Sequence, residues 1–576
     1  MDCRSGFRSF CCGLALAGFA VSASTSTAEP TATNAPTTVT FTKNIAPIIY
    51  NRCTGCHRPE QPGPFNLITY EDVKKRAQQI ADIVANHYMP PWPPEAGHAE
   101  FVGARTVPPD EIELLQEWVK AGAPEGEPAD LPPLPPANNG WKLGKPDLVV
   151  QMPFSYTVPA AGKDVYRNFV FPIPVNARKY VRGVDFNPGN PTVIHHAFIE
   201  VDPTRYSRLL AEKQTPPGFD GMELPETATM PSGQFLGWQP GKAPTFIPKG
   251  LAWELPTNTD LVLQLHMHPS GKPEAVQPTI AFYFTEDAPT NSAFRINLNP
   301  LLIDIPAGAR DYAIEDTYAL PIDVDLIGIA PHAHYLGKQL RGTAVFPDGN
   351  LLDLLVIQNW DFNWQGDYQY AKPIFLPKGT RLMMHFSYDN SAENVRNPNQ
   401  PPKRVKYGLQ TTDEMGELWL QVVPRKPAEL KVLAKDFYLH LLGNTLAYND
   451  QVVKENPNDA EAYTRAGRAR HYLGQFSQAL ADFNAAIRAN PAYDRAYYEL
   501  GFMELRLNQL NEAQKAFEKV IRLNPKDYEA QGNLGLICLQ RRDFVGARQH
   551  FEEALRINPQ DPVSRGYLEQ LKSAPL

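Results

Sequence analysis

The last quarter of this 576-residue chain repeats itself with a period of 34 residues. Small residues and phenylalanines recur at that spacing, and each repeat closes on an Asn-Pro pair. The repeated positions are Gly467, Gly501 and Gly535; Ala479, Ala513 and Ala547; Phe483, Phe517 and Phe551; and Pro457, Pro491, Pro525 and Pro559. Small residues let paired helices approach closely, and proline ends a helix because it lacks an amide N–H. The pattern therefore predicts a stack of helix pairs in residues 427–576 that begins with a helix at 427–454.

This repeat resembles the tetratricopeptide family, whose 34-residue unit is one helix pair. The resemblance implies an all-α solenoid that binds a protein partner on its concave face. The alternative is that the repeats only stiffen the protein or join its copies.

The first 28 residues have the pattern of a secretory signal peptide. Arg4 and Arg8 precede an apolar run from Phe10 to Val21, and small residues follow as far as Ala28. The run has roughly 12 residues, whereas a membrane span needs about 20. We therefore expect an exported protein, periplasmic or extracellular, with no membrane span in the mature chain. Its net charge of −8, without a basic patch, argues against nucleic-acid binding.

Cys53-Thr54-Gly55-Cys56-His57 has the spacing of a c-type haem attachment site. Two thiolates add to the porphyrin vinyl groups, and the adjacent histidine reaches the iron. A structural zinc ion would need four ligands, and the chain has no second cysteine pair to provide them. A thioredoxin-like dithiol would need a βαβ context, which is missing here. The motif therefore predicts covalent haem c on Cys53, Cys56 and His57.

Residues 40–125 resemble a small class I cytochrome c, which implies an all-α domain. Helices are expected at Ile45–Asn51 and Pro109–Ala121. Met89, which is followed by Pro90, resembles the methionine ligand of that family and is the predicted sixth ligand; His87 is the alternative, and no role is predicted for His98.

A different composition follows the haem segment. Residues 126–140 are proline-rich and predict an extended linker. Residues 141–425 contain short β-branched and aromatic runs broken by Pro, Gly and Asn, as in an all-β sandwich. Only 7 of the 56 prolines lie after residue 425, so the β-rich part ends where the helical repeats begin.

Histidines cluster in the β-rich part. His332 and His334 are two residues apart, so a strand would present both on one face. His195 and His196 are adjacent and would point in opposite directions on a regular strand, so both reach one ion only at a strand end or a bulge. His266 lies near His268 in sequence. Several imidazoles, or imidazoles with a methionine, suit copper, which cycles between Cu(II) and Cu(I).

Four motifs follow one another along the chain: Val193-Ile194-His195-His196, Leu263-Gln264-Leu265-His266, His332-Ala333-His334-Tyr335-Leu336-Gly337-Lys338 and Asp413-Glu414-Met415. They resemble the ligand motifs of the copper type II, ascorbate-dependent monooxygenases, the family of peptidylglycine α-hydroxylating and dopamine β-monooxygenases. The resemblance implies two jelly-roll-like sandwiches, at residues 141–290 and 291–425, and two copper ions. It assigns His195, His196 and His266 to the electron-transfer copper. It assigns His332, His334 and Met415 to the copper that binds O2 and oxidises substrate.

The other histidines of this part receive lesser roles. His268 is the substitute candidate for His266, and His385 is expected to be structural.

The chain departs from the family in two respects. Residues 141–425 contain no cysteine, whereas the family cores are braced by disulfides. Ala330 and Trp419 stand where the peptide-hydroxylating member has the Arg and Tyr that read a substrate carboxylate. We therefore expect a more apolar substrate than a carboxylate-terminated peptide.

Together these patterns predict a multidomain monooxygenase with a small all-α cytochrome domain, two β-sandwiches and a helical repeat tail. Electrons are expected from ascorbate or a redox protein, and from the fused haem by way of the copper at His195, His196 and His266. Two other functions stay open: a non-enzymatic haem–copper electron carrier or copper-binding scaffold, and a repeat-based assembly protein with degenerate metal sites.

Overall fold

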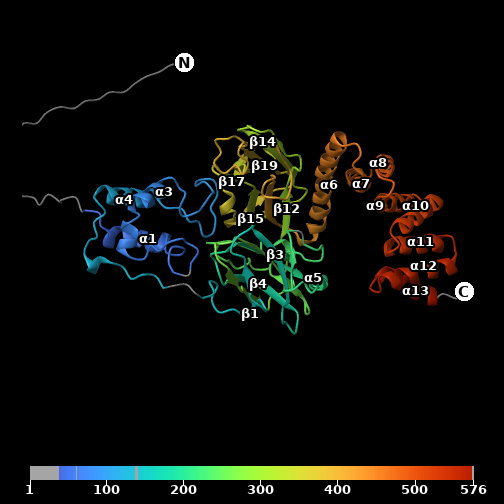
Figure 1. The fold of residues 1–576 in the computed structure, drawn as a ribbon, viewed down its shortest axis with the longest axis horizontal. Coiled ribbons are helices and arrows are strands. Elements are labelled where there is room, and N and C mark those ends of the chain that lie inside the picture. Colours follow the sequence, from blue (N-terminus) through green and yellow to red (C-terminus); the bar gives the residue numbers. More distant parts are fainter. Residues whose placement is uncertain (1–37, 60, 137–139, 223, 574–576) are drawn as a thin grey trace, which may run out of the picture.

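The computed structural model describes residues 38–59, 61–136, 140–222 and 224–573. They form an N-terminal helical region, two β units and a C-terminal row of helices (Figure 1). The predicted signal peptide at residues 1–28 lies outside the described residues. Within the described ranges, no helix combines the length and the apolar character that a membrane crossing requires.

The N-terminal region packs short helices around Trp118, whose side chain is fully buried. Phe41 contacts this indole at a ring-centroid distance of 6.1 Å, and Arg52 pairs with Glu111 at 2.9 Å, joining the first helix to the last. The elements are η1 (Phe41–Ile45), α1 (Ala46–Arg52), α2 (Tyr70–Lys74), α3 (Ala77–Ala85) and α4 (Pro109–Lys120). A short turn, η2 (Pro128–Asp130), interrupts the proline-rich segment that follows.

The first β unit consists of two antiparallel sheets that enclose one apolar core. One sheet has the order β1-β11-β4-β8 and the other β6-β3-β9-β5-β7, and β10-β2 forms a separate ribbon. The strands are β1 (Leu148–Gln151), β2 (Tyr156–Val158), β3 (Val165–Pro172), β4 (Lys179–Asn187), β5 (Ile194–Asp202), β6 (Phe219–Asp220), β7 (Gly237–Trp238), β8 (Trp253–Leu255), β9 (Asp260–Met267), β10 (Glu274–Val276) and β11 (Thr279–Thr285). Every residue of β9 is buried, so this strand is covered on both faces.

The second β unit repeats the arrangement around a larger core. Its sheets have the orders β12-β21-β15-β18 and β14-β19-β16-β17, with the ribbon β13-β20. The strands are β12 (Phe294–Leu298), β13 (Asp304–Ile305), β14 (Tyr312–Ala319), β15 (Val324–Ala333), β16 (Gly337–Val345), β17 (Leu351–Ile357), β18 (Tyr368–Leu376), β19 (Arg381–Tyr388), β20 (Val405–Lys406) and β21 (Gly416–Pro424). The prediction of β-sheets in the middle of the chain is confirmed.

A segment of the N-terminal region, residues 89–105, lies along the second β unit; we call it the strap. Its Val102 donates a main-chain N–H to the carbonyl of Gln369 at 2.8 Å, and Ala371 donates to the carbonyl of Glu100 at 2.8 Å. Phe101 is 9% exposed and belongs to the core of the second unit. The strap therefore extends a β-sheet of the second unit beside β18.

Side chains strengthen the same contact. Trp92 of the strap meets Tyr368 at a ring-centroid distance of 5.3 Å, and His98 pairs with Asp353 at 3.2 Å. His98, for which the sequence indicated no role, thus lies at the contact between the two regions.

Helix α6 (Leu430–Glu455) joins the second β unit to the repeats. Leu433 and Phe437 enter the core of the second unit, and Phe437 contacts Tyr318 at 5.1 Å. The predicted leading helix at 427–454 is therefore both a docking helix and the neighbour of the first repeat.

The repeats follow as antiparallel helix pairs (Figure 1). They are α7 (Ala460–Tyr472), α8 (Phe476–Ala489), α9 (Asp494–Arg506), α10 (Leu510–Leu523), α11 (Tyr528–Gln540) and α12 (Phe544–Ile557), with α13 (Pro562–Ser573) closing the row. The repeated alanines and phenylalanines identified in the sequence are all fully buried, as the helix-pair model requires.

The repeated glycines allow each helix pair to approach closely, and we expect Gly467→Ala to destabilise the repeats by about 1–3 kcal/mol. A Cβ at Gly467 would lie 2.6 Å from the ring of Phe483, which is fully buried and so has no room to move. Thermal unfolding followed by circular dichroism measures the effect.

Gly443 is the matched control because it lies on exposed helix surface, with no atom within 4 Å of an added Cβ. Gly443→Ala is expected to be neutral or stabilising by up to about 1 kcal/mol. Equal loss of stability in the two variants would contradict the packing role.

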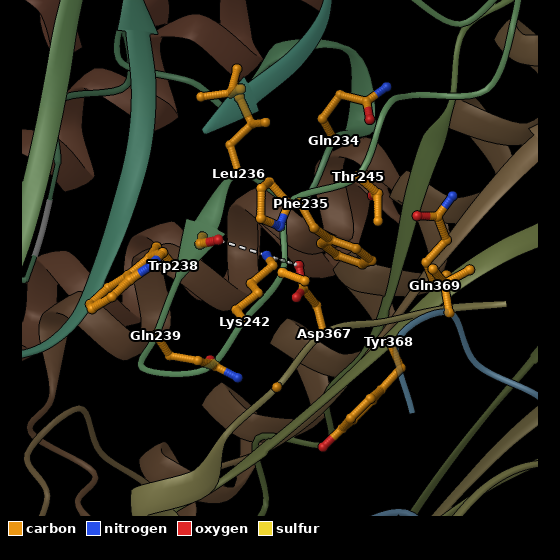
Figure 2. Close-up of a pocket in the computed structure, with 18 of the residues that line it drawn as sticks. Gln234, Phe235, Leu236, Trp238, Gln239, Lys242, Thr245, Asp367, Tyr368 and Gln369 are labelled. Carbon is orange, nitrogen blue, oxygen red and sulfur yellow. Dashed lines mark hydrogen bonds and ion pairs between the residues drawn. The ribbon is translucent and has the colours of Figure 1, made fainter. Parts of the chain in front are cut away.

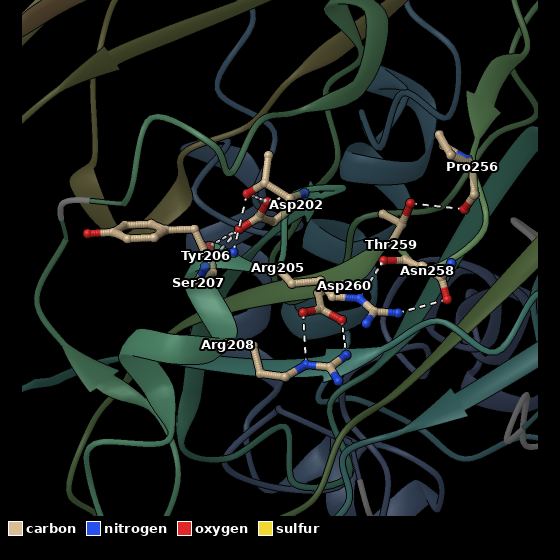
Figure 3. A network of polar contacts seen from close by, with 10 residues as sticks. Asp202, Arg205, Tyr206, Ser207, Arg208, Pro256, Asn258, Thr259 and Asp260 are labelled. Carbon is tan, nitrogen blue, oxygen red and sulfur yellow. Dashed lines mark hydrogen bonds and ion pairs between the residues drawn. The ribbon is translucent and has the colours of Figure 1, made fainter. Parts of the chain in front are cut away.

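A buried polar network fixes the end of β5 to α5 (Tyr206–Ala211) (Figure 3). Asp202 is fully buried and accepts hydrogen bonds from the backbone N–H and the hydroxyl of Ser207, at 2.8 and 2.6 Å, and from Thr204. Nearby, Arg208 binds the buried carboxylate of Asp260 through Nε at 3.0 Å. Burial raises the pKa of Asp202, but these hydrogen bonds outweigh burial and lower that pKa to about 2.

We expect Asp202→Asn to destabilise the first β unit by about 2 kcal/mol at neutral pH. Because the folded pKa lies below the unfolded value of about 3.9, the ionised Asp202 stabilises the fold above pH ~4. This contribution is lost as the pH falls from ~4 to ~2. Urea unfolding at pH 7 and pH 3 should therefore show a smaller difference between variant and parent at pH 3. The exposed Asp311→Asn is the control, and a difference that does not change with pH would refute the role of the charge.

Candidate metal centre

The structure brings His195, His196 and His266 together. His195 Nδ1 lies 3.1 Å from Nδ1 of His196 and 3.2 Å from Nδ1 of His266. Two ligands bound at about 2.0 Å in tetrahedral geometry lie about 3.3 Å apart, so these separations fit a shared metal ion. In the described part of the chain, two groups of three His, Cys, Asp or Glu side chains lie close enough to hold one metal ion, and these residues form one of them.

A β-bulge makes this arrangement possible. β5 pairs with β9 so that Ile194 faces Met267 and His196 faces His266, and the register shifts between Ile194 and His196. His195 is the extra residue, so it is released from the alternation that would send its side chain away from His196. The sequence allows His195 and His196 to share an ion only at a strand end or at a bulge, and the structure has the bulge.

Asp164 orients the third histidine. His266 donates from Nε2 to Asp164 Oδ2 at 2.9 Å, which leaves its Nδ1 lone pair toward His195. Metal-binding histidines usually hold a carboxylate or carbonyl in this way. Burial raises the pKa of Asp164, but hydrogen bonds from His266 and His268 lower it well below its ordinary value. Asp164 precedes β3, and no motif in the sequence marked it.

The ligand candidates are uncharged imidazoles. Burial, followed by the neighbouring His266 and His268, lowers the pKa of His195 to about 3. Burial also lowers the pKa of His196 well below its ordinary value. Neutral rings keep the lone pairs that a metal ion requires.

A second histidine pair lies at the end of β15. In its register with β21, His332 faces Glu417 and Ala333 faces Gly416, so His334 and Met415 are the next positions of this pairing. The two imidazole rings lie 5.2 Å apart. The backbones of His332, His334 and Met415 are thus brought together as the sequence predicted, and the sulfur of Met415 as a ligand stays a prediction.

Hydrogen bonds select the same nitrogen in both rings. His334 donates from Nδ1 to the carbonyl of Asp413 at 3.0 Å, and His332 donates from Nδ1 to Gln365 Oε1 at 2.5 Å. Both leave Nε2 as the available ligand atom. Burial and the neighbouring His332 lower the pKa of His334 to about 3.

Glu414 holds the backbone of this second site in place through hydrogen bonds. Its carboxyl group is fully buried and accepts backbone N–H groups of His334, of Leu336 at 3.0 Å and of Met415 at 2.9 Å. Burial raises its pKa to about 8, although these N–H groups act in the opposite direction. Gln365 and Glu414 are positioning residues that only the folded chain reveals, because their partners are far away in sequence.

One phenylalanine lies between the two histidine sites. The ring of Phe362, on the turn η4 (Phe362–Trp364), lies 6.2 Å from His195 and 5.6 Å from His334. Trp360, just before this turn, donates its indole N–H to the carbonyl of His334 at 3.1 Å. The ring of Phe362 therefore lies beside one histidine of each site.

The cysteine motif follows α1. His57 donates from Nδ1 to the carbonyl of Phe65 at 3.1 Å, which leaves Nε2 as the atom for an iron ligand. Gly63 allows the chain to return past the motif, since a Cβ there would lie 2.6 Å from the carbonyl of Cys56. Both cysteines are free thiols, and burial raises the pKa of Cys53 to about 12. The thiols of Cys53 and Cys56 and the free Nε2 of His57 are the groups that a covalently attached haem would use.

The remaining ligand candidates differ in their exposure and in their hydrogen-bond partners. Met89 is half-buried and His87 is exposed, and the choice between them as sixth ligand stays a prediction. His268 donates from Nδ1 to the other oxygen of Asp164 at 2.8 Å, so it lies beside the three-histidine site. His385 is exposed and pairs with Glu315 at 2.9 Å on the surface.

Comparison with known proteins bears on the C-terminal helices. The family model described as TPR repeat matches residues 467–505, and the model described as tetratricopeptide repeat matches residues 504–562. The crystal structure of MamA is similar at 20% identity over 23% of this chain and 76% of MamA, with a TM-score of 0.22. The TPR domain of Arabidopsis OM64 is similar at 21% identity over 20% of this chain and 97% of that domain, with a TM-score of 0.20. No curated protein matches the chain. The helices that the 34-residue period predicted are therefore tetratricopeptide repeats.

Proposed function

We propose that this chain is an exported copper-dependent monooxygenase that hydroxylates a C–H bond of an organic substrate. The observation that carries the proposal is the convergence of three imidazole nitrogens, with His195 Nδ1 within 3.2 Å of both of its partners. Copper bound by such ligands changes between Cu(II) and Cu(I) and supplies one electron at a time. His195, His196 and His266 would hold one ion, and His332, His334 and Met415 the other.

The proposed reaction is R–H + O2 + 2e⁻ + 2H⁺ → R–OH + H2O. It consumes two electrons, which matches two one-electron sites. The chain's contribution is to orient three of the ligand rings. Asp164, Gln365 and the carbonyl of Asp413 each hold the N–H of one histidine, so that its other nitrogen is free to bind a metal ion.

The surroundings of the second site support a substrate with an apolar part. Ala330 and Trp419 face each other in the pairing of β15 with β21. Residues 330 and 332 lie on the same face of β15 because alternate strand residues share a face. A methyl group and an indole therefore lie on the sheet face that carries His332.

The strap supports an electron supply from the N-terminal region. A donor held against its acceptor by the same chain has a high effective concentration. Trp92, three residues after Met89, contacts Tyr368 at 5.3 Å, and Tyr368 is three residues after the Gln365 that binds His332. This contact favours the second β unit as the entry point of electrons, whereas the sequence suggested the three-histidine site. The repeats would recruit a protein partner, as tetratricopeptide repeats do.

Analysis of the mature chain for metal and haem, followed by a search for ¹⁸O2 incorporation in a metabolite extract, tests the proposal. We expect two copper ions and one covalent haem per chain and one ¹⁸O atom per product molecule. Bound copper and haem without an oxygenated product would instead indicate an electron carrier or a copper scaffold. A chain without copper would indicate an assembly protein.

A further inference from the structure

A cavity of about 310 Å³ lies where three parts of the chain meet. The strap contributes Trp92 and Arg105, the first β unit contributes the loop 234–248, and the second contributes residues 364–369. Figure 2 shows Trp238 and Phe235 from the first unit with Tyr368 and Asp367 from the second around this space. The volume is within the range of small-molecule sites.

Two residues beside the cavity carry buried donors that lack partners. Tyr368 is 5% exposed, and its hydroxyl has no partner among the described residues. The buried indole N–H of Trp364 also lacks one within the described chain. A buried polar group without a partner costs about 1–3 kcal/mol. Both atoms are enclosed by protein and do not open into the cavity, so Arg105 is the group that a ligand there would meet.

Arg105 adds an uncompensated positive charge. Its guanidinium lies over the ring of Trp92, 5.8 Å from the centroid, and one of its nitrogens packs against Gly241, which has no side chain. No hydrogen bond or ion pair connects Arg105 to any described residue. Arg105 is half-buried, and a guanidinium partly removed from water is normally paired with an anion.

The carboxylates of the cavity are engaged elsewhere. Asp367 pairs with Lys242 at 2.6 Å, and this lysine also donates to the carbonyl of Gly237 (Figure 2). Asp185 accepts the backbone N–H of Lys142 at 2.7 Å, and burial raises its pKa. Neither carboxylate neutralises Arg105.

We propose that this cavity binds a carboxylate group, with Arg105 as its ion-pair partner. The carboxylate has two chemical sources: a propionate of the haem expected on Cys53 and Cys56, or a free organic acid. The first source rests on the proposed haem; the second does not. Cys56 is close enough for the charges of Arg105 and Lys142 to act on its thiol, which places the cysteine motif near the cavity.

The test uses benzoate as the probe and its neutral isostere benzamide as the control ligand. Binding is followed by fluorescence, because Trp92, Trp238 and Trp364 line the cavity. It is measured on the haem-loaded full chain and on the full-length Cys53→Ala/Cys56→Ala chain.

We expect benzoate to bind at least ~10-fold more tightly than benzamide. We expect Arg105→Gln to weaken benzoate binding by ~10-fold or more. Arg310→Gln, on an exposed ion pair, should have no effect.

The two sources give different results. If a haem propionate occupies the cavity, benzoate binds only the haem-free chain, and Arg105→Gln lowers the haem midpoint potential because the cation no longer balances the propionate. If the ligand is a free acid, benzoate binds both forms and the potential stays unchanged. The proposal is overturned if neither form prefers benzoate and the potential of the Arg105→Gln chain equals that of the parent. If the double cysteine variant does not fold, benzoate binding to the haem-loaded chain and the potential of the Arg105→Gln chain decide together. No measurement in this test requires copper or turnover. The binding and potential data can therefore be interpreted even if the monooxygenase proposal fails.

Discussion

We expect the parent chain to bind two copper ions and the His266→Ala chain to bind one. Removing this imidazole leaves His195 and His196 alone and frees Asp164 from its hydrogen bond at 2.9 Å. Loss of a carboxylate that orients a ligand typically costs 10–100-fold in metal affinity, so loss of the ligand itself should cost more than ~100-fold. Copper content after dialysis and the electron paramagnetic resonance spectrum of Cu(II) measure the change.

His268→Ala is the matched control. His268 shares Asp164 with His266 but is 40% exposed, whereas His266 is completely buried. The variant should keep both copper ions with a modest loss of affinity. If His268→Ala loses copper and His266→Ala retains it, the ligand assignment is wrong.

The His332→Ala chain is expected to form no hydroxylated product while it retains the copper of the three-histidine site. His332 lies at the end of β15, opposite Glu417, and is half-exposed. Its loss should therefore remove a ligand without opening the core. Oxygen uptake and ¹⁸O incorporation measure the reaction, and copper content reports the retained site.

His385→Ala provides the comparison, since its imidazole is exposed and binds only a surface glutamate. It should have parental activity. Product formation by the His332→Ala chain at the parental rate would place the chemistry elsewhere in the molecule.

The sequence predicted those features that depend on local periodicity. A 34-residue period places small and large residues at fixed positions on paired helices, and Gly467 against Phe483 is the contact that results. The adjacency of His195 and His196 required an irregular strand if they share an ion, and the bulge beside Ile194 provides it.

Other features depend on contacts between distant residues and left no local pattern. Asp164 meets His266 across 102 positions, and Glu414 meets His334 across 80. Phe362 is one of many phenylalanines in the sequence, and only the fold places it between two histidine sites. The strap lacks alternating hydrophobicity, because a few main-chain bonds and scattered side chains such as Phe101, Trp92 and His98 hold it to the second β unit.

This strap changes what the proline-rich segment has to do. Since main-chain bonds beside β18 fix the N-terminal module in place, the segment at 126–136 is a covalent tether rather than a spacer that sets distance. Insertions after Pro128 in this segment should be tolerated during evolution, and a protease cut there should leave both fragments in one particle. Mutations at the seam around Phe101 would instead separate the module from its neighbour while leaving the chain intact.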